Sequence, residues 1–84
     1  MGFCLITFRS VTYAQRGEAV LKRASIKCTL RRTPAGLSER GCSYCLQIRI
    51  GELPRAVKLL EAAEVSYSAV YRLDPEGKAE VMEI

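Results

Sequence analysis

The spacing of apolar residues switches along this chain between the two-residue period of a strand and the three-to-four-residue period of a helix. Residues 2–8 form a short, nearly continuous apolar run, which is typical of a strand buried inside a sheet. Residues 26–32 and 44–50 alternate apolar and polar side chains, as strands with one solvated face do. Residues 66–73 predict a fourth strand.

Two segments between these strands have helical spacing. Residues 11–24 follow Ser10, a good N-cap, and Gly17 inside them predicts that this helix lies close against the sheet. The second helix has Pro54 in its first turn, where a missing N–H is tolerated. The apolar stripes of the two helices are Ala14, Gly17, Val20, Leu21 and Ala24, and Leu53, Val57, Leu60 and Ala63.

The order strand, helix, strand, strand, helix, strand predicts an α+β fold. We expect the ferredoxin-like βαββαβ split sandwich, a four-stranded antiparallel sheet with strands one and three central and both helices on one face. At 84 residues the chain has room for one domain, residues 1–73. We expect a turn at residues 74–77 and an acidic tail over residues 74–84, frayed or paired as an edge strand.

Composition excludes several kinds of site. The chain has no His and no Trp, which removes Ser-His-Asp triads, Cys-His dyads and zinc sites that use His. Residues 1–50 carry nine Lys or Arg against two Glu, whereas residues 51–84 carry four against seven acidic residues. The basic half suggests an anionic substrate or partner. Strand three offers Gln47 and Arg49 where RNA-binding relatives of this fold stack bases on aromatic side chains, so we do not expect nucleic-acid binding.

The chain is expected to be cytoplasmic. No apolar stretch reaches the roughly 7–15 residues of a signal sequence or the roughly 20 of a spanning helix, so no membrane role is predicted. Thiols stay reduced in the cytoplasm, so the four cysteines, Cys4, Cys28, Cys42 and Cys45, need a reason other than structural disulfides. Cys4 and Cys28 lie in apolar strand patterns, where cysteine acts as a small hydrophobe.

Cys42 is the thiol most suited to chemistry. It lies in a polar, glycine-flanked loop that follows the irregular segment 33–41. The predicted topology brings residues 33–44 to the sheet edge that holds Arg9, Ser10 and Val11. A nearby helix N-terminus and arginines stabilise a thiolate, which is the reactive form of cysteine. The oxyanion or adduct contacts we expect around this loop come from Arg9, Arg32, Arg40, Gly41 and Ser43.

Cys45 stands at the Cys-x-x-Cys spacing of a redox pair or of half a metal site. This pair leads into a strand, whereas redox pairs of the thioredoxin kind open a helix. Cys45 is therefore a resolving thiol, a metal-binding thiol or a residue fixed by the strand pleat.

The chain resembles the small selenium/sulfur carrier proteins. The resemblance rests on Phe8-Arg9-Ser10 before a helix, the run from Leu30 to Pro34, Leu37-Ser38, and Gly41-Cys42-Ser43-Tyr44 leading into Leu46 to Arg49. It covers residues 3–73, and it implies that Cys42 is the carrier thiol. In that family a Cys-Gly pair usually stands where this chain has Cys42-Ser43.

We therefore expect a carrier without turnover chemistry, in which Cys42 bears a persulfide or selenopersulfide and no cofactor or metal is required. Its partners would be a sulfur or selenium donor enzyme and an acceptor protein, and a small core makes a homodimer a reasonable expectation. Two alternatives remain. One is a metal or iron–sulfur module built from Cys42 and Cys45 in a dimer, and the other is a regulatory domain that binds a small ligand.

Overall fold

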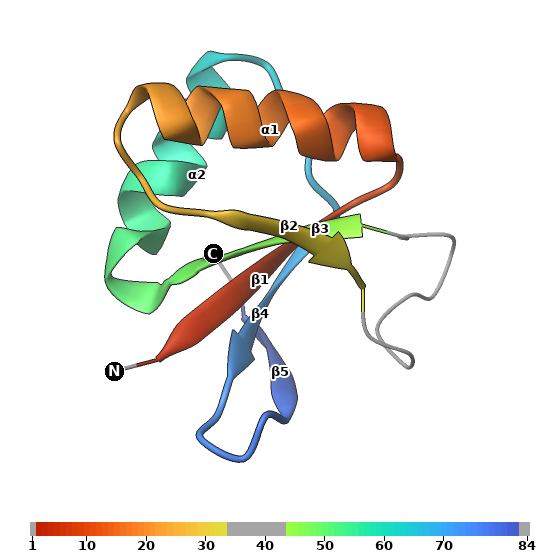
Figure 1. Ribbon diagram of the computed structural model, residues 1–84, viewed down its shortest axis with the longest axis vertical. Coiled ribbons are helices and arrows are strands. Elements are labelled where there is room, and N and C mark those ends of the chain that lie inside the picture. Colours follow the sequence, from red (N-terminus) through yellow and green to blue (C-terminus); the bar gives the residue numbers. More distant parts are fainter. Residues whose placement is uncertain (1, 34–43, 83–84) are drawn as a thin grey trace.

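The computed structural model describes residues 2–33 and 44–82. The strands are β1 (Phe3–Phe8), β2 (Thr29–Arg32), β3 (Tyr44–Arg49), β4 (Ala69–Leu73) and β5 (Ala79–Met82), and the helices are α1 (Val11–Arg23), α2 (Leu53–Ala62) and the short 3-10 turn η2 (Ile50–Glu52). The strands form one antiparallel sheet in the order β2-β3-β1-β4-β5. Both long helices lie on one side of it (Figure 1).

Within residues 2–33 and 44–82 the sheet has five strands, so the predicted count of four is wrong. The predicted turn at residues 74–77 is present, and Asp74 Oδ1 accepts hydrogen bonds from the backbone N–H groups of Glu76 at 2.9 Å and Lys78 at 2.8 Å. Gly77 has a φ of 86°, which glycine adopts without strain. This tight turn brings the tail back along β4, where β5 pairs with it as an edge strand.

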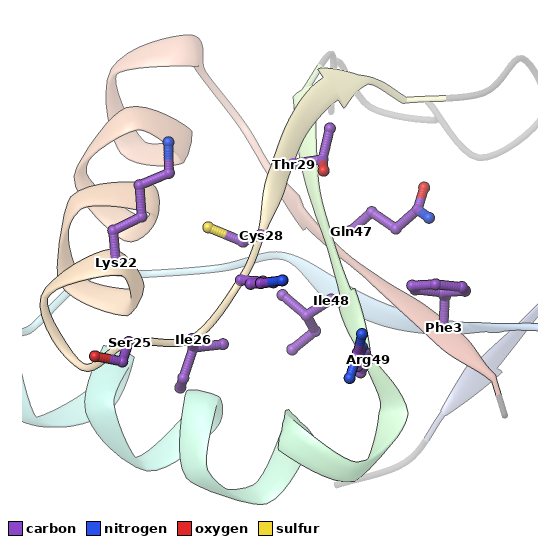
Figure 2. Close-up of a pocket in the computed structure, with 10 residues that line it drawn as sticks. Phe3, Lys22, Ser25, Ile26, Cys28, Thr29, Gln47, Ile48 and Arg49 are labelled. Carbon is purple, nitrogen blue, oxygen red and sulfur yellow. The ribbon is translucent and has the colours of Figure 1, made fainter.

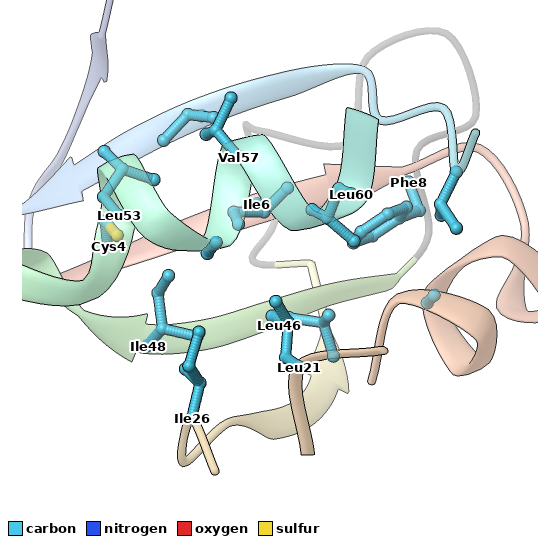
Figure 3. Packing of buried hydrophobic residues seen from close by; sticks show 14 residues of the cluster. Cys4, Ile6, Phe8, Leu21, Ile26, Leu46, Ile48, Leu53, Val57 and Leu60 are labelled. Carbon is cyan, nitrogen blue, oxygen red and sulfur yellow. The ribbon is translucent and has the colours of Figure 1, made fainter. Parts of the chain in front are cut away.

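The core lies between the sheet and the two helices. Cys4, Ile6 and Phe8 of β1 point to this side, together with Leu46 and Ile48 of β3. Figure 3 shows Leu53, Val57 and Leu60 of α2 over the same residues. The helical and strand periods of the sequence thus meet in a single apolar layer.

Gly17 lets α1 approach the sheet closely, as predicted. A Cβ at this position would lie 3.0 Å from the Phe8 ring, 3.2 Å from a Leu46 methyl and 3.3 Å from a Leu60 methyl. Interiors are close-packed, so even one added methyl at this point would displace its neighbours.

Each helix ends in a Schellman motif whose left-handed residue is not glycine. Ser25 has a φ of 63° and Glu64 a φ of 57°. The residues after them, Ile26 and Val65, donate their N–H groups back to Leu21 and Leu60. Ile26 is consequently tied to the end of α1, and β2 begins at Thr29 instead of at residue 26.

Candidate functional site

The ends of three strands meet at one edge of the sheet. Tyr44, the first residue of β3, pairs with Phe8 at the end of β1 and with Arg32 at the end of β2. Arg9 follows Phe8 directly, so two of the predicted basic residues, Arg9 and Arg32, come to the edge at which β3 begins. Both side chains are exposed.

The N-terminus of α1 lies at the same edge (Figure 1). Ser10 is its N-cap, as predicted, and its Oγ accepts a hydrogen bond from the Tyr13 N–H at 3.3 Å. The other free N–H groups of the first turn carry the positive end of the helix dipole. An anion at this edge would meet this partial charge and two guanidinium groups.

The remaining predicted site residues, Arg40, Gly41, Cys42 and Ser43, lie outside the described residues. The structure therefore places Arg9, Arg32 and Cys45 of the predicted set and leaves the carrier thiol itself as a prediction.

Cys45 is fully buried in β3, on the face of the sheet opposite the helices. It pairs across the sheet with Thr7 and Arg31, and its side chain has no exposed area. Burial raises the pKa of the Cys45 thiol, while the Arg31 charge and the Thr33 hydroxyl act in the opposite direction. The thiol is thus protonated at neutral pH and shielded from reagents, and both features disfavour nucleophilic attack by Cys45.

The two cysteines that we predicted to be structural also have raised pKa values. Burial raises the pKa of Cys4 from 9.0 to about 11. Cys28 is half-buried, and its Sγ donates to the Glu18 carbonyl at 3.9 Å. Burial and the Glu18 charge raise its pKa, which the Lys22 charge lowers. Cys4, Cys28 and Cys45 are all free thiols.

The buried Cys4 thiol makes the fold sensitive to alkaline pH. Its pKa is raised by folding, so the folded state holds the proton more tightly and stability is lost as pH rises from about 9 to about 11. The free energy of unfolding should fall by about 2–3 kcal/mol, since each unit of pKa difference between the folded and unfolded states corresponds to about 1.4 kcal/mol. Urea unfolding at pH 8 and pH 11 should show this loss in wild type and a correspondingly smaller one in Cys4→Val, and equal losses in the two proteins would contradict it.

Within residues 2–33 and 44–82, no three His, Cys, Asp or Glu side chains lie together in a group that could hold a metal ion. No helix in this part of the chain is long and apolar enough to cross a membrane.

The sequence reasoning missed a pocket at the opposite end of β3. Its charged residues, Lys22, Lys27 and Arg49, come from three separate elements, so no local motif signals them. Only the alternation around residues 26–32, which places Lys27 on the solvated side, hinted at one of them.

Comparison with known proteins adds one positive finding. The model of the family described as "Putative Se/S carrier protein-like" matches residues 3–72. No curated protein and no solved structure shows significant similarity to the chain.

Proposed function

We propose that this chain, which belongs to the "Putative Se/S carrier protein-like" family, carries a sulfur or selenium atom on Cys42. The family match over residues 3–72 is the observation that carries the proposal, because it spans both helices, the first three strands and all but the last residue of β4. The chain would act as a carrier between two proteins, with no turnover reaction of its own.

The transfer needs one nucleophilic thiolate. The Cys42 thiolate attacks the terminal sulfur of a persulfide on the donor enzyme, a new S–S bond forms, and the donor's own S–S bond breaks. The donor cysteine leaves as a thiolate, so electrons balance without an external oxidant. The acceptor then attacks the terminal sulfur of Cys42, or the terminal selenium of a selenopersulfide, and restores the Cys42 thiolate.

The sheet edge supplies suitable electrostatics for this step. Cys42 precedes Tyr44 by two residues, and two residues span at most about 7 Å. Tyr44 lies between the ends of β1 and β2, beside Arg9, Arg32 and the N-terminus of α1. Positive charge within this reach would favour both the attacking thiolate and the anionic persulfide that it forms. Arg40, Gly41 and Ser43 would add contacts from the loop.

A single-thiol carrier agrees with the surroundings of Cys45. A resolving thiol would attack the persulfide on Cys42 and release the sulfur as sulfide, closing a disulfide. Cys45 is fully buried with a raised pKa, which makes it a poor candidate for that attack. We therefore assign carriage to Cys42 alone and a packing role to Cys45.

We further propose a ferredoxin-like fold, a cytoplasmic location, and a donor enzyme and an acceptor protein as partners. The order β2-β3-β1-β4, with a helix after β1 and another after β3, supports a ferredoxin-like arrangement extended by β5. We place the carrier in the cytoplasm, where its thiols stay reduced. It would receive its cargo from a donor enzyme and deliver it to an acceptor protein, as a monomer or a homodimer.

Mass spectrometry of the loaded protein tests the proposal. The reduced chain is incubated with glutathione persulfide, digested, and each cysteine peptide is examined for the added mass of one sulfur atom. We expect the sulfur on the peptide that contains Cys42, before any of the three buried or half-buried thiols reacts. Loading of Cys4 or Cys28 first would contradict the assignment. Stoichiometric zinc or iron in protein purified without a chelator would instead support the metal module.

A further inference from the structure

A pocket of about 550 Å³ opens at the end of β3 that is remote from Tyr44. Figure 2 shows Lys22 and Phe3 on opposite sides of it, with Cys28 and Gln47 between them. The whole lining comes from the end of α1, the segment before β2, and strands β1, β2 and β3; it consists of Phe3, Lys22, Ser25, Ile26, Lys27, Cys28, Thr29, Gln47, Ile48 and Arg49.

The pocket exists because the chain between α1 and β2 diverges from β3. The pairing of β2 with β3 ends at Thr29 and Gln47, whereas β3 continues to Arg49. The Schellman motif at the end of α1 holds Ile26 back toward the helix, so residues 26–28 cannot continue the ladder.

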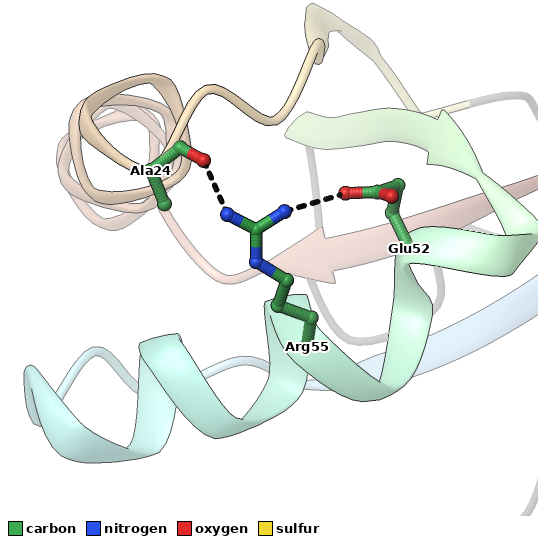
Figure 4. A network of polar contacts seen from close by, with 3 residues as sticks. All are labelled: Ala24, Glu52 and Arg55. Atoms are coloured by element: carbon green, nitrogen blue, oxygen red, sulfur yellow. Dashed lines mark hydrogen bonds and ion pairs between the residues drawn. The ribbon is translucent and has the colours of Figure 1, made fainter.

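Arg55 of α2 fixes the rim of this opening. Its Nη2 donates to the Ala24 carbonyl at 2.6 Å, and its Nη1 lies 3.3 Å from Glu52 Oε2 (Figure 4). The guanidinium thereby ties the end of α1 to the start of α2, next to Ser25. One hydrogen bond from α2 thus fixes the residue that precedes Ser25 of the pocket lining.

The described lining offers positive charge and hydrogen-bond donors. It includes three cations, Lys22, Lys27 and Arg49, and no carboxylate. Lys22 is paired with Glu18 at 3.3 Å, so most of the uncompensated charge comes from Lys27 and Arg49, which are both exposed. Gln47 Oε1 accepts a hydrogen bond from Arg31 at 2.6 Å, which leaves the amide NH₂ group to donate. Such a lining selects an anion with several acceptor oxygens.

The other side of the pocket is apolar. Phe3 is 43% exposed on the face of β1 away from the helices, and it pairs across the sheet with Arg49. Ile26 and Ile48, which belong to the core on the helix side of the sheet, also line the pocket. An aromatic ring next to a guanidinium provides a surface on which a flat ring can stack.

We propose that this pocket binds a small phosphate ester that carries a flat ring, of the size of a nucleoside diphosphate. Its volume lies within the roughly 300–1,000 Å³ of small-molecule sites. The phosphates would lie against Lys27, Arg49 and the Gln47 amide, and the ring against Phe3. The site is separate from the carrier edge, because Tyr44 and Arg49 are about 17 Å apart at the usual rise of a strand. Ligand binding in this pocket is therefore independent of the thiol chemistry of Cys42.

Calorimetric titration of the full chain with ADP, inorganic pyrophosphate and adenosine tests the proposal. We expect saturable binding of ADP, weaker binding of pyrophosphate and the weakest binding of adenosine. Lys27→Gln and Arg49→Gln should each weaken ADP binding about tenfold, the loss of one charge-assisted contact. Lys58→Gln removes an exposed charge on α2 outside the pocket lining and should leave ADP binding unchanged.

The Phe3→Leu variant distinguishes the contact made by the ring from the contacts made by the phosphates. It should weaken ADP binding and leave pyrophosphate binding unchanged, since only the ring contacts Phe3. Equal binding of ADP and pyrophosphate by wild type would overturn the assignment of the ring. If neither ADP nor pyrophosphate binds saturably, the proposed site is wrong. It is also wrong if Lys58→Gln weakens ADP binding as much as Lys27→Gln and Arg49→Gln do.

Discussion

A Cys42→Ser variant is expected to lose persulfide loading to the background level and to keep its fold. A serine hydroxyl is not ionised at neutral pH and forms no persulfide, so the variant can neither accept nor hold the transferred sulfur. Loading with glutathione persulfide, followed by intact-mass spectrometry, measures the effect. Unchanged urea unfolding would show that the loss is chemical.

Cys45→Ala is the matched control, because it removes the other thiol of the same Cys-x-x-Cys spacing. We expect it to load as wild type does and to hold the persulfide for as long or longer. The substitution should lower the free energy of unfolding by about 1–2 kcal/mol, since Cys45 has no exposed area and its sulfur fills part of the interior. Loss of transfer in Cys45→Ala, with a Cys42–Cys45 disulfide accumulating in wild type, would replace the carrier model with a redox one.

Phe8→Ala is expected to produce the largest loss of stability, about 3–5 kcal/mol. Phe8 has no exposed area, and its ring packs so close to α1 that a Cβ at Gly17 would lie 3.0 Å from it. A domain of 84 residues has a free energy of unfolding of about 4–13 kcal/mol, so this substitution removes a large share of it. Urea unfolding followed by far-ultraviolet circular dichroism gives the value.

Phe3→Ala provides the comparison within the same strand. Phe3 is 43% exposed on the face away from the helices, so its truncation should cost about 1 kcal/mol or less. If Phe8→Ala does not fold, Phe8→Leu should still show a measurable loss larger than that of Phe3→Ala. Equal losses for the two positions would contradict the assignment of the core to the helix-covered face.

The sequence predicted the order of the two long helices and the first four strands, because apolar periodicity is a local property. Helix α1 begins at its predicted N-cap, Ser10, and Pro54 lies in the first turn of α2, as predicted. Element boundaries were less accurate: β2 and β4 begin three residues later than predicted. For β2 the reason is the Schellman motif at Ser25, which carries no glycine and so left no recognisable signal.

Local pattern by itself determined the class of fold and the two helices, because spacing and residue type suffice for these. The choice of Cys42 as the candidate thiol stays a prediction. Tertiary structure decided which of two similar residues is buried. Phe8 and Phe3 belong to one apolar run, yet Phe8 is fully buried and Phe3 is 43% exposed. Cys45 lies on the face away from the helices and is nevertheless fully buried. The pocket cations come from α1, the segment before β2, and β3, which only the folded chain brings together. Long-range proximity has no local period, so sequence spacing could not reveal it.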